Sequence, residues 1–182
     1  MTGNEDNDIQ PGNDPGYTGA PAPLLSWDIF MGGYQRKMKL LDDAKMIHDL
    51  SKQFNWKHGW DFRQKLLAQE KVILVTDPLL HIVCASSNLF EMNGYHPREV
   101  VGQKPSMFQG AATTEASRQL IRSAIQSQQP FDTNIINYKK NGSLYDCHIE
   151  GYPVFNAQKE LVHFVAFEAP HPQPFSPGGE GS

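Results

Sequence analysis

The chain has 182 residues, which suits one domain with tails, and 39% of them are hydrophobic, a share that indicates some segments outside a packed core. Its formal net charge of -4 equals the charge of the four acidic residues among the first 23, so the remainder is neutral. A neutral body lacks the basic surface of nucleic-acid-binding proteins, and we expect no nucleic-acid partner.

Both ends of the chain are rich in Gly and Pro. Residues 1–23 carry four acids and no Lys or Arg, and residues 170–182 repeat the Pro/Gly bias. Such segments bury too little apolar surface to offset the entropy of ordering, so we predict two disordered tails. No signal peptide or membrane-length apolar run is visible, and we expect a cytoplasmic protein without membrane contact.

Residues 24–70 are predicted to form a helical extension. Leu40, Ala44, Ile47 and Leu50 fall on one helical face. This block is also unusually aromatic, and large aromatic side chains are normally buried. We therefore expect it to dock on the body of the same chain or on a second copy. The aromatic residues are Trp27, Phe30, Trp56 and Trp60, with Ile29 among them.

Residues 71–169 mix strands and helices. Two β-rich runs, 72–76 and 82–85, are followed by short helices, of which 88–93 ends at Gly94 and the next begins with Pro97. Thr113 or Thr114 can cap a longer helix that ends at Gln126. The residues expected to face inward on that helix are Ala116, Leu120, Ile121 and Ala124.

After Pro130 the pattern becomes that of a meander. Strands are predicted at 134–138 and 144–154, joined by an Asn-Gly turn, and a last strand runs over 161–167. The last strand is apolar on both faces, so its outer face needs cover, for which the helical extension is the candidate. The predicted fold class is α+β, with a five-stranded antiparallel sheet, helices on one face and the N-terminal helical extension.

Residues 71–169 resemble a PAS domain, and within that family the LOV subgroup. The order and spacing of several short motifs carry the resemblance, although each motif alone is weak. The motifs are Val75-Thr76-Asp77-Pro78, Gly94-Tyr95, Arg98-Glu99-Val100-Val101-Gly102, Gln109-Gly110, Asn137-Tyr138-Lys139-Lys140-Asn141-Gly142 and Pro153-Val154.

The LOV signature reads Gly-x-Asn-Cys-Arg-Phe-Leu-Gln-Gly, and residues 102–110 depart from it. Pro105 replaces the cysteine that bonds the excited flavin, Ser106 replaces the arginine that pairs with the flavin phosphate, and Lys104 replaces the pocket asparagine. The resemblance thus implies the LOV scaffold, while these substitutions argue against its cysteine photochemistry.

Four further positions match the family's flavin pocket. Gln109 and Asn137 retain the family residues and are candidate ligand contacts, or else are satisfied by local backbone. Cys147 and Glu168 replace an asparagine and a glutamine. Cys147 is interpreted as a small apolar core residue, as is Cys84. A buried ionised Glu168 would be unfavourable without a partner. No cofactor is favoured, and the resemblance leaves FMN or another flavin open.

We predict neither a metal site nor an enzyme. His148 and His163 could lie on adjacent strands, but two His without a third ligand are typical of surface or cross-strand residues. The sequence contains none of the common catalytic or phosphate-loop motifs.

The main hypothesis is a non-catalytic PAS sensory and protein-interaction module in signal transduction, with or without a small ligand in its cavity. It would pair through its sheet face and N-terminal helices, with a second copy or with a partner signalling protein. The alternative is a flavin-binding photoreceptor that works by flavin photoreduction instead of a cysteine adduct.

Overall fold

The structure, a computed structural model, describes residues 22–171, without the side chains of residues 22–26. Both predicted tails lie outside the described residues except at their inner edges. There the structure differs from the prediction, since helix α1 (Ala22–Gln53) begins one residue before Pro23 and strand β5 (Leu161–Pro170) includes Pro170. Proline is tolerated in the first turn of a helix. The end of β5 is still paired, because Cys147 lies opposite Pro170.

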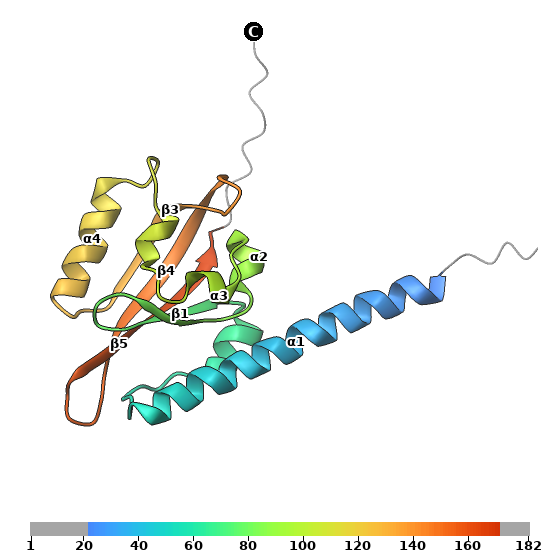
Figure 1. Cartoon of the computed structure of the whole chain (residues 1–182), viewed down its shortest axis with the longest axis horizontal. Coiled ribbons are helices and arrows are strands. Elements are labelled where there is room, and N and C mark those ends of the chain that lie inside the picture. Colours follow the sequence, from blue (N-terminus) through green and yellow to red (C-terminus); the bar gives the residue numbers. More distant parts are fainter. Residues whose placement is uncertain (1–21, 172–182) are drawn as a thin grey trace, which may run out of the picture.

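A five-stranded antiparallel sheet forms the centre of the molecule (Figure 1). Its other strands are β1 (Val72–Thr76), β2 (Ile82–Ala85), β3 (Phe131–Tyr138) and β4 (Leu144–Phe155). The spatial order is β2-β1-β5-β4-β3, so the last strand of the chain lies in the middle of the sheet. The predicted α+β class, the strand number and the antiparallel pairing are confirmed.

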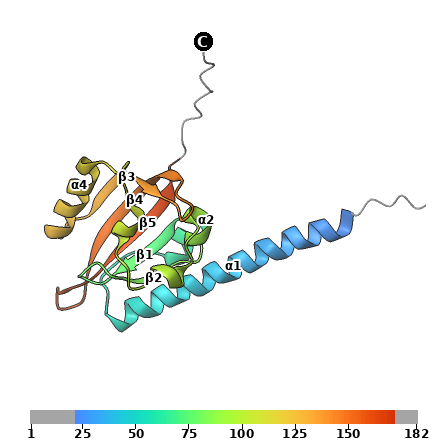
Figure 2. The ribbon, with the colours of Figure 1, turned by 45° about the horizontal axis from the view of Figure 1, so that its top comes forward.

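Four short helical elements cover one side of the sheet, which we call the inner face (Figure 2). They are α2 (Leu89–Asn93), α3 (Pro97–Val100), the 3-10 helix η2 (Pro105–Phe108) and α4 (Glu115–Gln126). As expected, Gly94 ends α2 in the left-handed conformation, with a φ of 81°. Thr114 caps α4 by accepting a hydrogen bond from the backbone N–H of Ser117 at 3.2 Å.

The prediction for the inward face of α4 was partly wrong. Ala116 and Leu120 are exposed, whereas Ile121 and Ala124 are half-buried, and no residue of α4 is fully buried. The guanidinium of Arg118 joins α4 to the preceding loop, because it donates to the backbone oxygen of Gly110 at 2.6 Å. A cavity, and not a filled core, lies beneath the helix.

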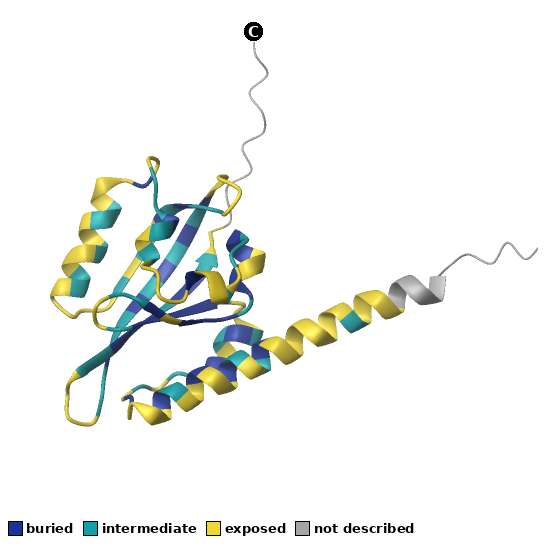
Figure 3. Ribbon diagram, in the orientation of Figure 1, coloured by how far each residue is buried: buried dark blue, intermediate teal, exposed yellow. Residues whose placement is uncertain are grey.

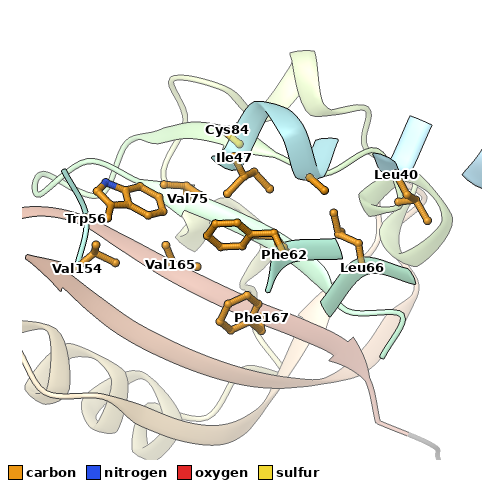
Figure 4. Close-up of a cluster of buried hydrophobic side chains, with 12 residues drawn as sticks. Leu40, Ile47, Trp56, Phe62, Leu66, Val75, Cys84, Val154, Val165 and Phe167 are labelled. Carbon is orange, nitrogen blue, oxygen red and sulfur yellow. The ribbon is translucent and has the colours of Figure 1, made fainter. Parts of the chain in front are cut away.

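The other side, the outer face, is covered by α1 and by η1 (Gln64–Ala68), a single π-helical turn. Leu40, Ala44 and Ile47 are buried against the sheet, as the spacing predicts, whereas Leu50 is half-buried at the edge of the same cluster. Figure 4 shows Ile47 of α1, with Phe62 and Leu66, facing strand residues that include Val165 and Phe167 of β5. The strand predicted to need outer cover therefore receives it from the helical extension.

The aromatic residues of the extension divide into two groups. Trp56 and Trp60 pack in or against the outer core, and the Trp60 ring lies 5.3 Å from the Phe167 ring, centroid to centroid. Trp27 and Phe30 are each 62% exposed, so of the two expected docking partners the chain's own body does not bury them, and docking on a second copy stays a prediction. The reason is geometric: the first half of α1 projects past the sheet and is exposed along most of its length (Figure 3).

Candidate ligand-binding cavity

A cavity of about 380 Å³ lies between α4, η2 and the inner face of the sheet. Its size falls within the range of small-molecule sites, and such sites are mostly apolar with a few polar groups. The same description fits here, because large apolar side chains from every neighbouring element form most of the wall. They are Leu74, Phe108, Ile121, Ile125, Phe131, Ile135, Ile149 and Phe164.

Two polar side chains in the wall have atoms without a hydrogen-bond partner in the described part of the chain. Asn137 is only 4% exposed, and its Oδ1 accepts no hydrogen bond. Thr76, at the end of β1, is equally buried, and its Oγ1 is also unpaired. Because buried polar groups are normally satisfied, both atoms are acceptors left open behind the wall, although neither has appreciable accessible surface in this structure.

Glu168 adds an acid to the wall from the middle strand β5. Its side chain is buried, and its only hydrogen-bond contact in the described residues is with the Sγ of Cys147, 3.8 Å from Oε2. Burial raises the pKa of the Glu168 carboxyl to about 7, and the weak contact with the thiol opposes this only slightly. The cavity therefore has one acid that changes charge near neutral pH.

Of the four pocket positions named from the sequence, three line the cavity: Gln109, Asn137 and Glu168. Gln109 Oε1 accepts a hydrogen bond from Arg118 Nε at 3.3 Å, so its carbonyl is already engaged. Cys147 is fully buried in the inner core beside Glu168 and is not part of the cavity wall.

Sequence reasoning missed Thr76, Arg118 and Arg122, which also line the cavity. The two arginines lie four residues apart on α4, so the helical period alone would have placed them on one face. With Lys104 from the loop before η2, they bring three basic residues to the α4 side of the cavity. Pro105 and Ser106, at the positions of the LOV cysteine and arginine, line it as well.

Neither cysteine is a reactive group. Cys84 is buried on the outer face and Cys147 on the inner face, and burial is the main cause that raises the pKa of both thiols. Reactive cysteines have lowered pKa values, so these thiols are poor nucleophiles. Among residues 22–171, no group of three or more His, Cys, Asp or Glu side chains could hold a metal ion. Within the same range, no helix has the length and apolarity needed to cross a bilayer.

Strand β5 connects the cavity to the helical extension, because its side chains alternate between the two faces. Phe164, Ala166 and Glu168 line the cavity, whereas Phe167 packs in the outer core. His163 also points outward, and its Nδ1 accepts a hydrogen bond from Trp56 Nε1 at 3.0 Å. A shift of this strand therefore moves side chains on both faces of the sheet.

Comparison with known proteins agrees with this architecture. The sequence pattern of the PAS domain family matches residues 70–168, just over half of the chain. A blue-light-activated histidine kinase from Brucella canis is 38% identical over 97 residues, which cover 52% of this chain and 20% of that protein. Protein TWIN LOV 1 from Arabidopsis thaliana is 34% identical over 100 residues, covering 53% and 25%. The matched region thus spans a quarter or less of these relatives.

Solved LOV structures share the fold. A light-oxygen-voltage domain studied with a flavin analogue superimposes with a TM-score of 0.58 at 19% identity, covering 63% of this chain and 87% of the other. The LOV domain of a blue-light-activated histidine kinase from Erythrobacter litoralis gives a TM-score of 0.54 at 20% identity, covering 57% and 97%. At identities this low, the structural matches show the shared fold alone.

Proposed function

Because this chain belongs to the PAS domain family, we propose that it is a sensory and protein-interaction module without a catalytic site of its own. Its inner cavity would hold a small ligand, and the α1 extension on the outer face would report whether the ligand is present. A second copy, or a partner signalling protein, would read that report. The observation that carries the proposal is the double role of β5, which lines the cavity with Ala166 and supports the extension with Phe167.

The mechanism is a shift between two packings of α1 against the outer face. A ligand can shift such an equilibrium only if it contacts the two states differently. Occupying the cavity would press on the inner side chains of β5, and the outer side chains of the same strand would move with them. Interfaces of packed side chains change between discrete arrangements more readily than they deform continuously.

The test is to fill the cavity and watch the helix. Ala166→Phe places a ring in the space that a ligand would occupy, and hydrogen exchange reports the protection of the α1 amides over residues 40–53. We expect those amides to change their exchange rate in this variant. Val101→Phe adds the same ring at an exposed position and is the matched control. Identical α1 protection in Ala166→Phe and the unmodified protein would rule out this coupling.

A second candidate is a flavin-binding photoreceptor that works by photoreduction. The relatives named for blue-light activation support it, as does the presence of Gln109 and Asn137 in the cavity wall. The LOV cysteine position holds Pro105, so an adduct with the flavin would have no thiol there. FMN would need to bind with Glu168 beside it in place of an amide.

Absorption spectroscopy tests the flavin candidate directly. The protein is scanned before and after incubation with excess FMN, and the unbound FMN is removed. Retained flavin bands that bleach under blue light in the presence of an added electron donor, and recover by reoxidation in air, would support photoreduction. A colourless protein that keeps no FMN would leave the ligand-sensing module as the function.

A further inference from the structure

The cavity contains a buried acid that no basic side chain neutralises. Glu168 is 4% exposed, and it forms no ion pair among the described residues. Its one hydrogen-bond partner in the described residues, the Cys147 thiol, is a weak donor. An ionised carboxylate in an apolar setting is strongly unfavourable until it is paired and hydrogen-bonded. A ligand that supplies the missing donors would relieve this penalty on binding.

The other unsatisfied groups of the wall point to the same ligand chemistry. Asn137 Oδ1 can only accept a hydrogen bond, and the Thr76 hydroxyl can accept one as well. Together with Glu168, these groups make the sheet side of the wall rich in acceptors, whereas Lys104, Arg118 and Arg122 lie on the α4 side. Most of the remaining wall is apolar and includes the rings of Phe108, Phe131 and Phe164. A ligand that matches both features is a flat aromatic ring with N–H donors on its edge.

We propose that the cavity binds a planar aromatic base with an amidine-type edge, whose two neighbouring N–H groups bind the Glu168 carboxylate as a fork. Guanine and pterin rings have such an edge, and so does an aminopyrimidine that is protonated on the ring nitrogen. Two parallel hydrogen bonds to an ionised carboxylate are among the strongest and most specific polar contacts in proteins. This inference rests on the proposed function only in that the cavity holds a small ligand.

The same geometry makes Glu168 a specificity-determining residue. A ring edge that presents carbonyl oxygens, as the flavin edge does on both sides of its single N–H, brings acceptors against a carboxylate. Such a ligand binds only when Glu168 is protonated or replaced by an amide. Glu168→Gln should therefore change the preference of the cavity from ligands with an amidine-type edge to ligands with a carbonyl edge.

Benzamidine and benzamide are the probes, because they have the same size and shape and differ in the edge. Binding is measured by calorimetry at pH 8, where the acid is ionised, in the full chain and in Glu168→Gln. We expect the full chain to bind benzamidine about tenfold or more tightly than benzamide, the usual effect of hydrogen bonds to a charged group. Glu168→Gln should lose that preference, and its affinity for FMN should rise.

Two controls separate this site from surface carboxylates and from misfolding. Glu160→Gln removes an exposed acid in the β4–β5 turn and should leave the preference for benzamidine intact. Thermal melting establishes that Glu168→Gln is folded. Equal binding of the two probes, no binding of either, or a preference that persists in Glu168→Gln would each overturn the inference. The coupling to α1 is measured separately with Ala166→Phe and can fail independently.

Discussion

At the scale of single residues, Glu168 sets the chemistry of the cavity and also makes the fold sensitive to pH. Its pKa rises from an ordinary 4.5 to about 7 in the folded chain, chiefly because burial disfavours the charged form. The folded state therefore binds the proton more tightly than the unfolded state does. The stabilisation from the protonated form is complete below pH 4.5 and is lost as the pH rises through 7.

Replacing this acid by its amide should remove the pH dependence. Relative to Glu168→Gln, the free energy of unfolding of the unmodified protein should fall by about 2.5 kcal/mol between pH 5 and pH 8. Urea denaturation of both proteins at pH 5 and pH 8 measures the difference, and groups that titrate in both cancel. Parallel pH profiles for the two proteins would mean that Glu168 is paired or hydrated in the folded chain.

The limits of sequence reasoning at this scale are physical. The family pattern assigned Gln109, Asn137, Cys147 and Glu168 to the pocket, and the structure brings three of them to the cavity wall. It could not tell that Glu168 on β5 lines the cavity while Cys147 on the adjacent strand β4 does not, because that difference depends on how the side chains of the two strands pack. The spacing of Arg118 and Arg122 could have placed them on one helix face, but the contact of Arg118 with the Gly110 backbone is visible only in the folded chain.

At the scale of elements, the packing of β5 against the helical extension can be tested most directly, because removing it should release the extension. Phe167 is completely buried between Trp60 and the Nζ of Lys65, which lies 4.6 Å from the ring centroid. Phe167→Asp removes the ring and buries a charge in its place. Truncating a buried Phe typically costs about 3–5 kcal/mol, and burying a charge adds to that cost.

We expect α1 to detach in Phe167→Asp while the inner core stays folded. Trypsin should then cleave at Lys45, Lys52 and Lys57, and the mass in solution should change if α1 also forms a dimer. Phe167→Leu keeps an apolar side chain and is the matched control, which should retain protection. Circular dichroism separates detachment from unfolding. A folded Phe167→Asp protein with unchanged cleavage would show that the outer face does not hold the extension.

The elements themselves were largely predictable. Period-two alternation identified β4, and the Asn-Gly turn fixed its pairing with β3. Strand ends were less accurate, since β3 begins three residues before the predicted start, directly after Pro130. The inward face of α4 was missed because an amphipathic pattern assumes a filled core beneath the helix, and here there is a cavity.

At the scale of the whole molecule, the N-terminal half of α1, which projects past the sheet, is the surface that we expect to bind a partner. Four large side chains at helical spacing are exposed on one stripe: Trp27, Phe30, Tyr34 and Met38. Apolar patches of this kind mark interaction sites. Sequence reasoning identified the aromatic load but could not divide it between the body and a partner, because that depends on where the helix leaves the sheet.

Charges beside the stripe favour a second, parallel copy of the same helix. Lys37 and Asp42 are exposed and form no ion pair among the described residues. They are five residues apart and flank the stripe on its two sides, the spacing of charge pairs that join parallel coiled-coil helices. In a parallel dimer, Lys37 of each copy would meet Asp42 of the other, so the two-fold symmetry gives two such pairs. The two sheets would then lie on opposite sides of the helix pair.

A charge exchange tests both the dimer and its direction. Phe30→Asp should give a monomer by light scattering, whereas Lys39→Asp, about 100° around the helix from Met38, should not. Lys37→Glu places like charges opposite each other and should weaken the dimer several-fold at low salt, and Lys37→Glu with Asp42→Lys should restore it. Restoration requires the parallel register, because in an antiparallel pair the two positions do not meet. A monomeric unmodified protein at high concentration would instead assign the stripe to a different signalling protein.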